Sequence, residues 1–370
     1  MKFTCEKNAL VSAISVASRT VAQKSTIPAL EGIYIRAGVK LTLSGYNLET
    51  GITISVDAEI QQTGACIMPS RLFFDIIRKL PGDTVSISVD EKFKVSIRGG
   101  ISSFSITAMS SEDYPELPEV ESDKGISLPQ NELKAMIGGT SFAVSENQAR
   151  PIHTGCLFEV EDTSITVVAV DGYRLALRRW KSEEPIGRTL KFVVPAAALK
   201  EAEKILGDTD EACTFFLGSK HILFTIGEAT LVCRLLEGEF LDWRRVLPQT
   251  QPVKLAVNVA KMTDSIERVG LIISEKLKSP VRCKFGENTA DFRSVSTIGE
   301  AHDVCQIAGD GQDMEIGFNC RYLLDALRAI PDAECSLELI NGLSPIVMNP
   351  CDGSERYSYM VLPVRLKAGE

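Results

Sequence analysis

Short stretches of the chain alternate between apolar and polar residues, for example 85–89 (VSISV) and 93–97 (FKVSI). Such alternation is typical of strands in an antiparallel sheet that has one packed and one solvated face. Elsewhere two apolar residues stand four positions apart, as Leu10 and Ile14 do, which indicates the buried face of a helix. The pattern therefore predicts an α+β fold in which helices pack on antiparallel sheets.

The same order of elements occurs three times along the chain. An apolar strand, a helix and a tight turn follow one another in residues 66–84, 192–209 and 316–333. A proline ends the strand in the first two segments, and an asparagine ends it in the third. Three coincidentally similar α+β domains are the alternative explanation. We expect three copies of one unit, each with two helices.

The front half of each unit recurs as well. A short apolar strand at 3–5, 126–128 and 255–257 precedes a helical stretch in every copy. Polar segments that contain proline separate the copies, at 115–119 and 247–252. We therefore expect three tandem clamp-type domains with the boundaries 1–120, 126–247 and 253–366.

The composition limits the class of protein. The chain has 40 Lys and Arg against 49 Asp and Glu, and the net charge of −9 argues against binding DNA by simple attraction. No apolar run approaches the roughly 20 residues of a membrane span, and the first residues lack the apolar stretch of a signal peptide. Ten cysteines are scattered without a C-x-x-C pair, so we expect reduced thiols in a cytoplasmic protein.

Basic residues recur at one place in the second helix of each copy. Arg78, Lys204 and Arg328 occupy equivalent positions, and Arg71 and Arg321 match one another seven residues earlier. A solvated helix face is the simpler explanation for any one of them. Three repeats that present such a face to one side can, however, curve into a ring with a positive bore. The residues that we expect to face DNA are Lys24, Arg71, Arg78, Lys134, Lys200, Lys204, Arg321 and Arg328.

The sequence gives little sign of catalysis. It has three histidines, and none stands in a metal-ligand spacing such as H-E-x-x-H. Phosphate-binding and nucleophile motifs are also missing at the expected strand-to-helix junctions. We expect a non-enzymatic protein without a cofactor or a metal ion. An enzyme that uses dispersed carboxylates with Mg²⁺, and a repeat scaffold that binds only proteins, remain as alternatives.

Four segments carry a resemblance to a known family. Residues 168–177 (VAVDGYRLAL) contain an Asp-Gly pair that predicts a tight hairpin. The other segments are 149–152 (ARPI), 239–248 (EFLDWRRVLP) and 359–366 (YMVLPVRL). Together they resemble the bacterial β sliding clamp, the processivity subunit of the replicative DNA polymerase. The resemblance covers essentially the whole chain.

This resemblance implies a head-to-tail homodimer, a six-lobed ring that encircles double-stranded DNA without reading its sequence. Retention would then be topological, which reconciles the ring with the negative net charge. The implied role is to tether the replicative DNA polymerase subunit and confer processivity. The clamp loader, other polymerases, ligase and mismatch-repair proteins would share one peptide cleft. No membrane partner is expected.

The resemblance also implies which residues form the peptide cleft, between the second and third copies. An apolar pocket rimmed by arginines suits a short peptide with Leu or Phe anchors. Tyr173 and His153 depart from residues that are common in the family. Leu175, Val246 and Leu362 also alternate as ordinary core positions do. The implied cleft residues are Arg150, His153, Val170, Gly172, Tyr173, Arg174, Leu175, Leu241, Arg245, Val246, Tyr322, Leu343, Met360, Leu362, Pro363, Val364 and Arg365.

The contact between subunits follows from the same resemblance. Phe104 and Ile106, on an edge strand of the first copy, would meet Leu271 and Ile272 of the third copy. Leu72 would pack beside them. Such a heterologous contact closes into a ring only if the rotation between subunits is right.

Overall fold

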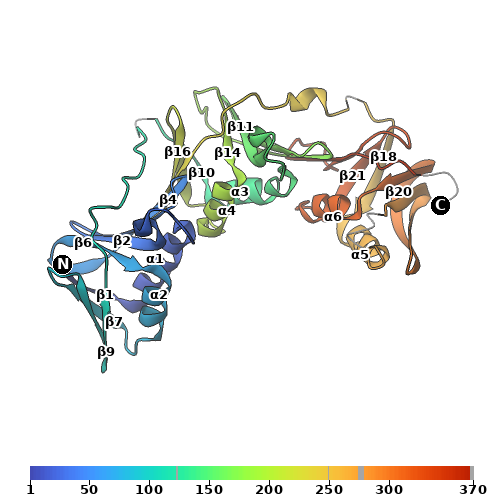
Figure 1. The fold of residues 1–370 in the computed structure, drawn as a ribbon. Helices are drawn as coiled ribbons and strands as arrows, with labels where there is room; N and C mark the ends of the chain where they lie inside the picture. The colour runs from blue at the N-terminus through green and yellow to red at the C-terminus, as the bar shows by residue number, and fades with distance from the viewer. Residues whose placement is uncertain (122–123, 249, 274–278, 367–370) are drawn as a thin grey trace. The chain divides into compact units, whose positions relative to one another are not determined.

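The computed structural model describes residues 1–121, 124–248, 250–273 and 279–366 (Figure 1). These residues form two compact units. The first contains the described residues up to 134 together with 201–235, and the second contains 135–200 together with the described residues from 236 onward. The middle copy of the predicted repeat therefore contributes strands to both units. The joint predicted at 247–252 includes residue 249, which lies outside the described residues.

The first copy lies in the first unit. Its elements are β1 (Lys2–Glu6), α1 (Lys7–Ala17), η1 (Ser18–Thr20), η2 (Pro28–Glu31), β2 (Gly32–Ala37), β3 (Leu41–Tyr46), β4 (Thr50–Val56), β5 (Ala58–Gln62), β6 (Gly64–Pro69), α2 (Ser70–Lys79), β7 (Thr84–Val89), β8 (Lys94–Gly99) and β9 (Ser102–Thr107). The order matches the prediction, with one helix before the first run of strands and one before the last three.

The second copy repeats this order. Its elements are β10 (Ile126–Pro129), α3 (Gln130–Gly138), η3 (Ser141–Ala143), η4 (Pro151–Thr154), β11 (Gly155–Glu161), β12 (Ser164–Val170), β13 (Arg174–Lys181), β14 (Leu190–Pro195), α4 (Ala196–Ile205), β15 (Ala212–Leu217), β16 (His221–Ile226) and β17 (Ala229–Arg234). The 3-10 helix η5 (Trp243–Arg245) follows in the segment that leads to the third copy.

The third copy has longer strands. Its elements are β18 (Val253–Asn258), α5 (Val259–Gly270), β19 (Val281–Ser296), β20 (Gly299–Phe318), α6 (Cys320–Arg328), β21 (Glu334–Leu339), β22 (Ile346–Pro350) and β23 (Tyr357–Val361). β19 and β20 form one long hairpin with irregular register between Phe285 and Thr289. The two strands take the place of the separate strands between the two helices of the other copies.

All strand pairs are antiparallel, as the alternation predicts. The first unit holds a five-stranded sheet in the order β5-β1-β7-β8-β9 and an eight-stranded sheet in the order β10-β15-β16-β17-β4-β3-β2-β6. The second unit holds a ten-stranded sheet in the order β14-β11-β12-β13-β23-β22-β21-β18-β20-β19. In Figure 1, α1 and α2 lie together against the sheets of the first unit, and α5 and α6 lie together in the second.

The second helices show why the sequence repeats. Phe73, Leu199 and Leu323 occupy equivalent positions in α2, α4 and α6, and each is fully buried. A buried residue also follows three positions later in each helix, at Ile76, Ala202 and Ala326. Each helix therefore buries the same stripe in its sheet and leaves the opposite face to charged residues.

Two strand pairs join one copy to the next by backbone hydrogen bonds. β4 of the first copy pairs with β17 of the second, with Ile54 opposite Ala229. β13 of the second copy pairs with β23 of the third, with Arg178 opposite Tyr357. In both joints the third strand after a first helix pairs with the third strand after a second helix. None of the helices in the described ranges is long and apolar enough to cross a membrane.

Candidate ligand-binding pocket

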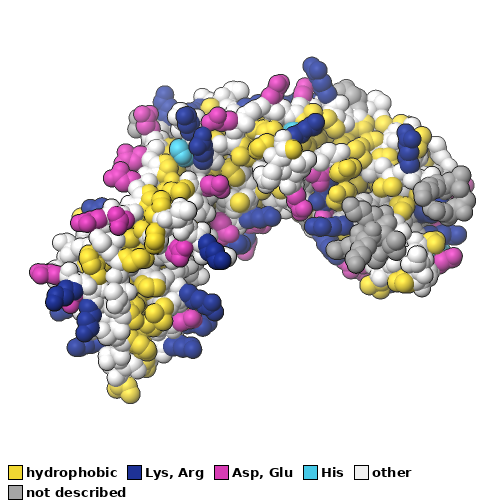
Figure 2. All heavy atoms as spheres, viewed as in Figure 1, with side chains coloured by type: hydrophobic (Ala, Val, Ile, Leu, Met, Phe, Trp, Pro, Cys, Tyr) yellow, Lys and Arg dark blue, Asp and Glu magenta, His cyan; other side chains and the backbone are white. Residues whose placement is uncertain are grey.

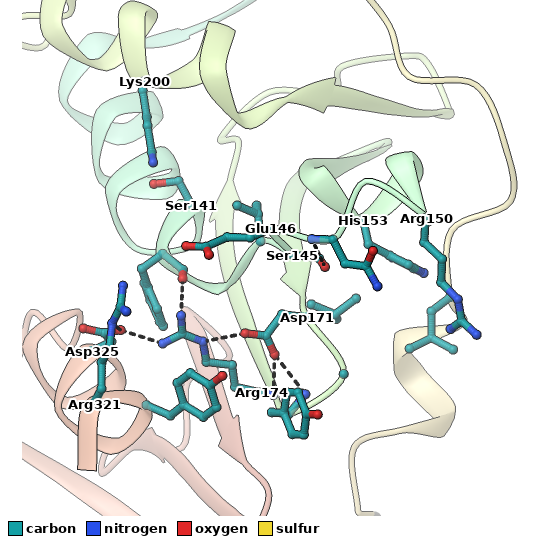
Figure 3. Close-up of a pocket in the computed structure, with 18 residues that line it drawn as sticks. Ser141, Ser145, Glu146, Arg150, His153, Asp171, Arg174, Lys200, Arg321 and Asp325 are labelled. Atoms are coloured by element: carbon teal, nitrogen blue, oxygen red, sulfur yellow. Dashed lines mark hydrogen bonds and ion pairs between the residues drawn. The ribbon is translucent and has the colours of Figure 1, made fainter. Parts of the chain in front are cut away.

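The second unit contains a cavity of about 880 Å³ where the second and third copies meet (Figure 3). Its wall comes from η3 and the segment after it, the β12–β13 hairpin, the start of α6 and one residue each from α4 and the 236–248 segment. The lining residues are Ser141, Phe142, Val144, Ser145, Glu146, Asn147, Arg150, His153, Val170, Asp171, Gly172, Tyr173, Arg174, Lys200, Leu241, Arg321, Tyr322 and Asp325.

The Asp-Gly sequence forms the tight hairpin that it predicts. Gly172 has a φ of 91°, in the left-handed region that favours glycine. One carboxylate oxygen of Asp171 accepts the backbone N–H groups of Tyr173 at 2.9 Å and Arg174 at 3.0 Å. These bonds fix the turn and direct the Arg174 side chain across the pocket wall.

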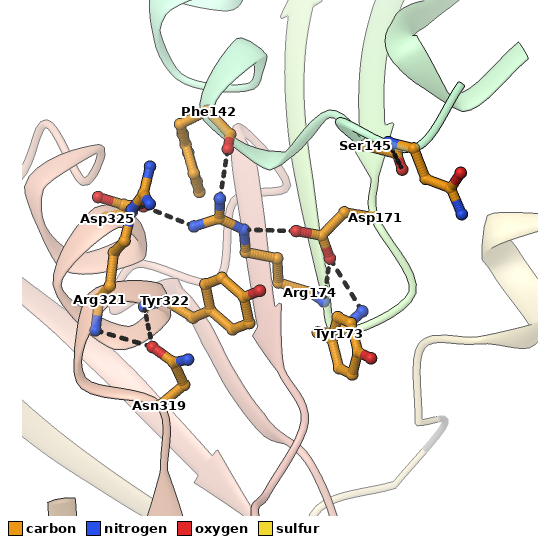
Figure 4. A network of polar contacts seen from close by, with 10 residues as sticks. Phe142, Ser145, Asp171, Tyr173, Arg174, Asn319, Arg321, Tyr322 and Asp325 are labelled. Atoms are coloured by element: carbon orange, nitrogen blue, oxygen red, sulfur yellow. Dashed lines mark hydrogen bonds and ion pairs between the residues drawn. The ribbon is translucent and has the colours of Figure 1, made fainter. Parts of the chain in front are cut away.

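Arg174 is the centre of a polar network (Figure 4). Its Nε donates to Asp171 at 3.0 Å, and its two terminal nitrogens donate to Asp325 and to the carbonyl oxygen of Phe142, both at 2.6 Å. The guanidinium lies 4.4 Å from the ring centroid of Tyr322 and 5.3 Å from that of Phe142. Only 7% of the residue is exposed. Hydrogen bonds occupy the edges of the guanidinium, and the rings of Tyr322 and Phe142 lie over it.

The position of Asp325 follows from the start of α6. The Asn319 side chain accepts the backbone N–H groups of Arg321 at 3.0 Å and Tyr322 at 3.3 Å, which caps the helix. Tyr322 then lies one turn before Asp325 on the side of the helix that faces the hairpin. The third copy thus supplies an aromatic face and a carboxylate to an arginine of the second copy.

The internal repeat places an acidic residue at this position in all three second helices, with different partners. Asp75 and Glu201 occupy the positions in α2 and α4 that Asp325 occupies in α6. Asp75 pairs with Arg78 at 3.2 Å, and Glu201 pairs with Lys204 at 2.7 Å, each three residues along its helix. Glu201 also lies 3.5 Å from Arg19 of the first copy. Asp325 pairs instead with Arg174 at 2.6 Å, and the equivalent cation Arg328 pairs with Glu267 at 2.6 Å.

Eight of the residues predicted for the cleft line the cavity: Arg150, His153, Val170, Gly172, Tyr173, Arg174, Leu241 and Tyr322. Tyr173 is 61% exposed and stacks on Tyr322 with ring centroids 6.0 Å apart. Burial, and then the nearby Arg150, lower the pKa of His153. Burial, and then Asp171, raise the pKa of Tyr322. Both rings are therefore uncharged at neutral pH.

Four other predicted residues belong to an apolar cluster near the cavity. Leu175 and Met360 are 1% and 3% exposed, so they have almost no surface with which to contact a ligand. Val246 and Leu362 are half-buried against the same cluster. Leu175 is therefore a core residue, as its place in an alternating strand also allows. The structure gives no support for a direct contact between Leu175 and a peptide.

The remaining predicted cleft residues lie outside the cavity wall: Arg245, Leu343, Pro363, Val364 and Arg365. Arg245 is 87% exposed and pairs with Asp242 at 3.0 Å. Its neighbour Arg244 has a different role, because it donates to Glu159 at 2.8 Å and lies 4.2 Å from the ring of the buried Trp243. The 239–248 motif is thus fastened to β11 by its first arginine and leaves the second at the surface.

Ten lining residues were not predicted for the cleft: Ser141, Phe142, Val144, Ser145, Glu146, Asn147, Asp171, Lys200, Arg321 and Asp325. Lys200 and Arg321 are the most informative, since the repeat predicts that they face DNA. Asp171 stood inside the quoted Asp-Gly motif, and its proximity to Arg174 in sequence could have indicated the pair. Nothing in the sequence brings Phe142 or Asp325 to this hairpin.

The other basic residues predicted to face DNA lie on helices or loops of both units. Lys24, Arg71, Arg78, Lys204 and Arg328 are exposed. Lys134 is only 31% exposed and pairs with Asp208 at 2.8 Å. The cations at the ends of α2, α4 and α6 each have an acidic partner, which sequence reasoning missed. Figure 2 shows Lys and Arg side chains interspersed with Asp and Glu over the face in view.

The residues predicted for a subunit contact are at exposed edges. Phe104 and Ile106 lie on β9, which is an edge strand of the five-stranded sheet as predicted. Phe104 and Leu72 are each more than 40% exposed. Leu271, which follows α5 directly, is 82% exposed, and Ile272 beside it is half-buried.

The architecture defines a protein of three tandem α+β copies with a ligand-sized cavity between the last two. Comparison with known proteins gives the same division. Models of the DNA polymerase III beta subunit match the chain with its N-terminal domain at residues 1–118, its central domain at 127–242 and its C-terminal domain at 244–365. The chain therefore belongs to the DNA polymerase III beta subunit family, and the fold class predicted from the sequence is confirmed.

Individual relatives cover nearly the whole chain. A beta sliding clamp of Staphylococcus epidermidis is 32% identical over 381 residues, which is 99% of both chains. The crystal structure of the DNA polymerase sliding clamp of Bacillus subtilis has a TM-score of 0.94 and 30% identity, and covers 99% of this chain and 100% of its own. A putative DNA polymerase III beta subunit of Eubacterium rectale has a TM-score of 0.93 and 32% identity, with 98% and 99% covered. These names are those of clamps and of a polymerase subunit, in agreement with the expectation of an accessory subunit.

We expect the substitution Arg174→Lys to destabilise the second unit. A lysine cannot satisfy Asp171, Asp325 and the Phe142 carbonyl together, so the free energy of unfolding should fall by about 2 kcal/mol or more. Both tryptophans, Trp180 and Trp243, lie in this unit, so urea unfolding followed by tryptophan fluorescence reports on it.

The matched control is Arg245→Lys, since Arg245 is 87% exposed. This change should alter stability by no more than about 0.5 kcal/mol. If both variants unfold at the same urea concentration as the wild type, Arg174 does not hold the joint.

Proposed function

We propose that the chain acts as a DNA sliding clamp, a head-to-tail homodimer that encircles duplex DNA and tethers replication and repair proteins to it. The proposal rests on how one copy joins the next. At both joints inside the chain, the third strand after a first helix pairs with the third strand after a second helix. Within the described residues, the same rule leaves one free strand edge in the first copy and one in the third.

The two unsatisfied edges belong to β9 and to the first part of β20. β9 is the counterpart of β17 and β23, and in the described residues only β8 pairs with it. Residues 299–306 of β20 are the counterpart of β4 and β13. β18 pairs with β20 only through Ile307 and Ala308, so 299–306 leave one edge without a strand. An exposed edge of this kind is a template for pairing with another chain.

Both internal joints predict the same register for this third joint. Ala229 lies opposite Ile54 in the first joint, and Tyr357 lies opposite Arg178 in the second. The counterparts of these residues are Ser102 in β9 and Asp303 in β20. A second subunit would therefore place Ser102 opposite Asp303, and Phe104 opposite Ala301. Because the two partners are different surfaces of the same chain, the contact is heterologous and closes with two subunits if the rotation allows.

The surroundings of the two edges support this pairing. Arg268 of α5 pairs with Asp303, which holds the end of α5, and with it Leu271 and Ile272, beside the β20 edge. Phe104 and Leu72 supply exposed apolar surface on the other partner. The predicted contact of Phe104 and Ile106 with Leu271 and Ile272 thus agrees with the register.

A closed ring explains how an acidic chain stays on DNA. Exposed Lys and Arg side chains on the second helices, among them Arg71, Arg78 and Arg328, would meet phosphates without reading bases. Their acidic partners weaken each contact, which suits a ring that slides. The residues that we propose for the bore are those predicted from the sequence, with Lys200 and Arg321 at the border of the cavity.

The cavity is the proposed site for short segments of client proteins. Tyr173 and Leu241 offer exposed apolar surface, and Arg150 and Tyr322 add polar groups around it. This combination suits a peptide with Leu or Phe anchors. The proposed clients are the replicative polymerase subunit, the clamp loader, other polymerases, ligase and mismatch-repair proteins.

The domain boundaries and the compartment complete the proposal. We place the domains at 1–120, 126–247 and 253–366. The scattered cysteines, most of them buried, support a cytoplasmic protein with reduced thiols.

Disruption of the proposed third joint should separate the subunits. Phe104→Asp puts a charge at an exposed position of the β9 edge opposite apolar groups, so we expect the particle mass to fall from twice 40.4 kDa to 40.4 kDa in light scattering at micromolar concentration. Val39→Asp, at a fully exposed turn position, serves as the control and should leave the mass unchanged. A wild-type protein that is monomeric, or a variant that stays dimeric, would contradict the joint.

Encirclement predicts a dependence on DNA topology. After assisted loading, the protein should remain on nicked circular DNA through a wash in high salt and should leave when the circle is cut, because a ring slides off a free end. Gel filtration of labelled protein with the DNA measures the bound fraction. Equal loss from circular and linear DNA would mean ordinary electrostatic binding.

A further inference from the structure

The cavity has an uneven distribution of charge. Seven of its lining residues are basic or acidic: Arg150, Arg174, Lys200, Arg321, Glu146, Asp171 and Asp325. A count of charges alone would make the wall almost neutral. The geometry shows, however, that the pairs are not distributed evenly along the wall.

Arg174 takes up two of the three carboxylates. Its guanidinium binds Asp171 at 3.0 Å and Asp325 at 2.6 Å, and both carboxylates are at most 22% exposed. The closest ion pairs of both carboxylates are therefore those with Arg174, and Asp325 has a longer contact of 3.9 Å with Arg321.

Two cations are left at one end of the cavity. Lys200 of α4 is exposed, and within the described ranges no carboxylate forms an ion pair with it. Arg321 of α6 lies 3.9 Å from Asp325, at the limit of an ion pair, and is 71% exposed. Figure 3 shows Lys200 and Arg321 on the same side of the cavity and Arg150 at the far side.

The third carboxylate does not offset this pair. Glu146 is exposed and has no ion-pair partner among the residues that the structure describes. Its negative charge in the cavity wall repels a polyanion more strongly than it repels a single carboxylate. A single carboxylate near Lys200 and Arg321 meets less of this repulsion.

We infer that the end of the cavity formed by Lys200 and Arg321 is a subsite for the carboxylate of an Asp or Glu in the bound client segment. The inference rests on the proposed peptide-binding function and adds the chemistry that the segment must carry. The apolar anchors would occupy the wall formed by Tyr173 and Leu241. An acidic residue would then lie on one flank of the anchors.

The test uses the full-length protein and fluorescently labelled peptides with Leu and Phe anchors. Three peptides differ only in the flanks: Gln on both sides, Glu on the amino-terminal side, or Glu on the carboxyl-terminal side. We expect one of the Glu peptides to bind about five-fold more tightly than the Gln peptide at low salt, as one or two exposed ion pairs allow. The preference should shrink as salt rises.

The variant Lys200→Gln with Arg321→Gln should remove this preference, so that the three peptides bind to it with the same affinity. The matched control is Lys92→Gln with Lys220→Gln, which removes two exposed turn lysines outside the cavity. The control should keep the five-fold preference that the wild type shows.

The outcomes separate this inference from the proposed function. If the Gln peptide binds but neither Glu peptide binds more tightly, the acidic subsite is refuted while the peptide cleft stands. If no peptide binds, the peptide cleft itself is refuted. If the preference persists in the Lys200 and Arg321 variant, or if that variant loses only DNA retention, the two cations serve DNA and the inference is wrong.

Discussion

The pairing of β13 with β23 is the constraint on which the candidate site depends. Backbone hydrogen bonds carry one sheet across the joint between the second and third copies, so the hairpin at Gly172 and the start of α6 meet in a fixed register. Without this pairing, Arg174 would have no carboxylate from the third copy. The β12–β13 hairpin in the cavity wall is held at both ends by this sheet.

The internal repeat shows how the site arose from a structural element. In α2 the acidic residue of the second helix pairs with a cation of its own helix, and in α4 Glu201 pairs both with Lys204 of its own helix and with Arg19 of the preceding copy. In α6 the equivalent Asp325 makes its closest ion pair with Arg174 of the preceding copy. This pair couples the second copy to the third, next to the contact of Tyr322 with the guanidinium.

The sequence predicts those features that depend on local pattern. The two helices in each copy, the antiparallel strands and the Asp171–Gly172 hairpin follow from periodicity and turn chemistry over a few residues. The burial of Leu175 and Met360 could not be decided, because an alternating strand looks alike in a core and beneath a pocket. The placement of Lys200 and Arg321 in the cavity wall, and the bond from Arg174 to Phe142, depend on which copies meet. That information lies in the tertiary contacts between residues far apart in the chain.

The account rests on the idea that the edges of β9 and β20 meet in a second subunit and that two chains enclose a hole. Electron microscopy of single particles of the purified protein tests this most directly. The account predicts closed rings with two chains, six similar lobes and a central opening wide enough for a double helix. Isolated arcs, or compact particles without an opening, would contradict it.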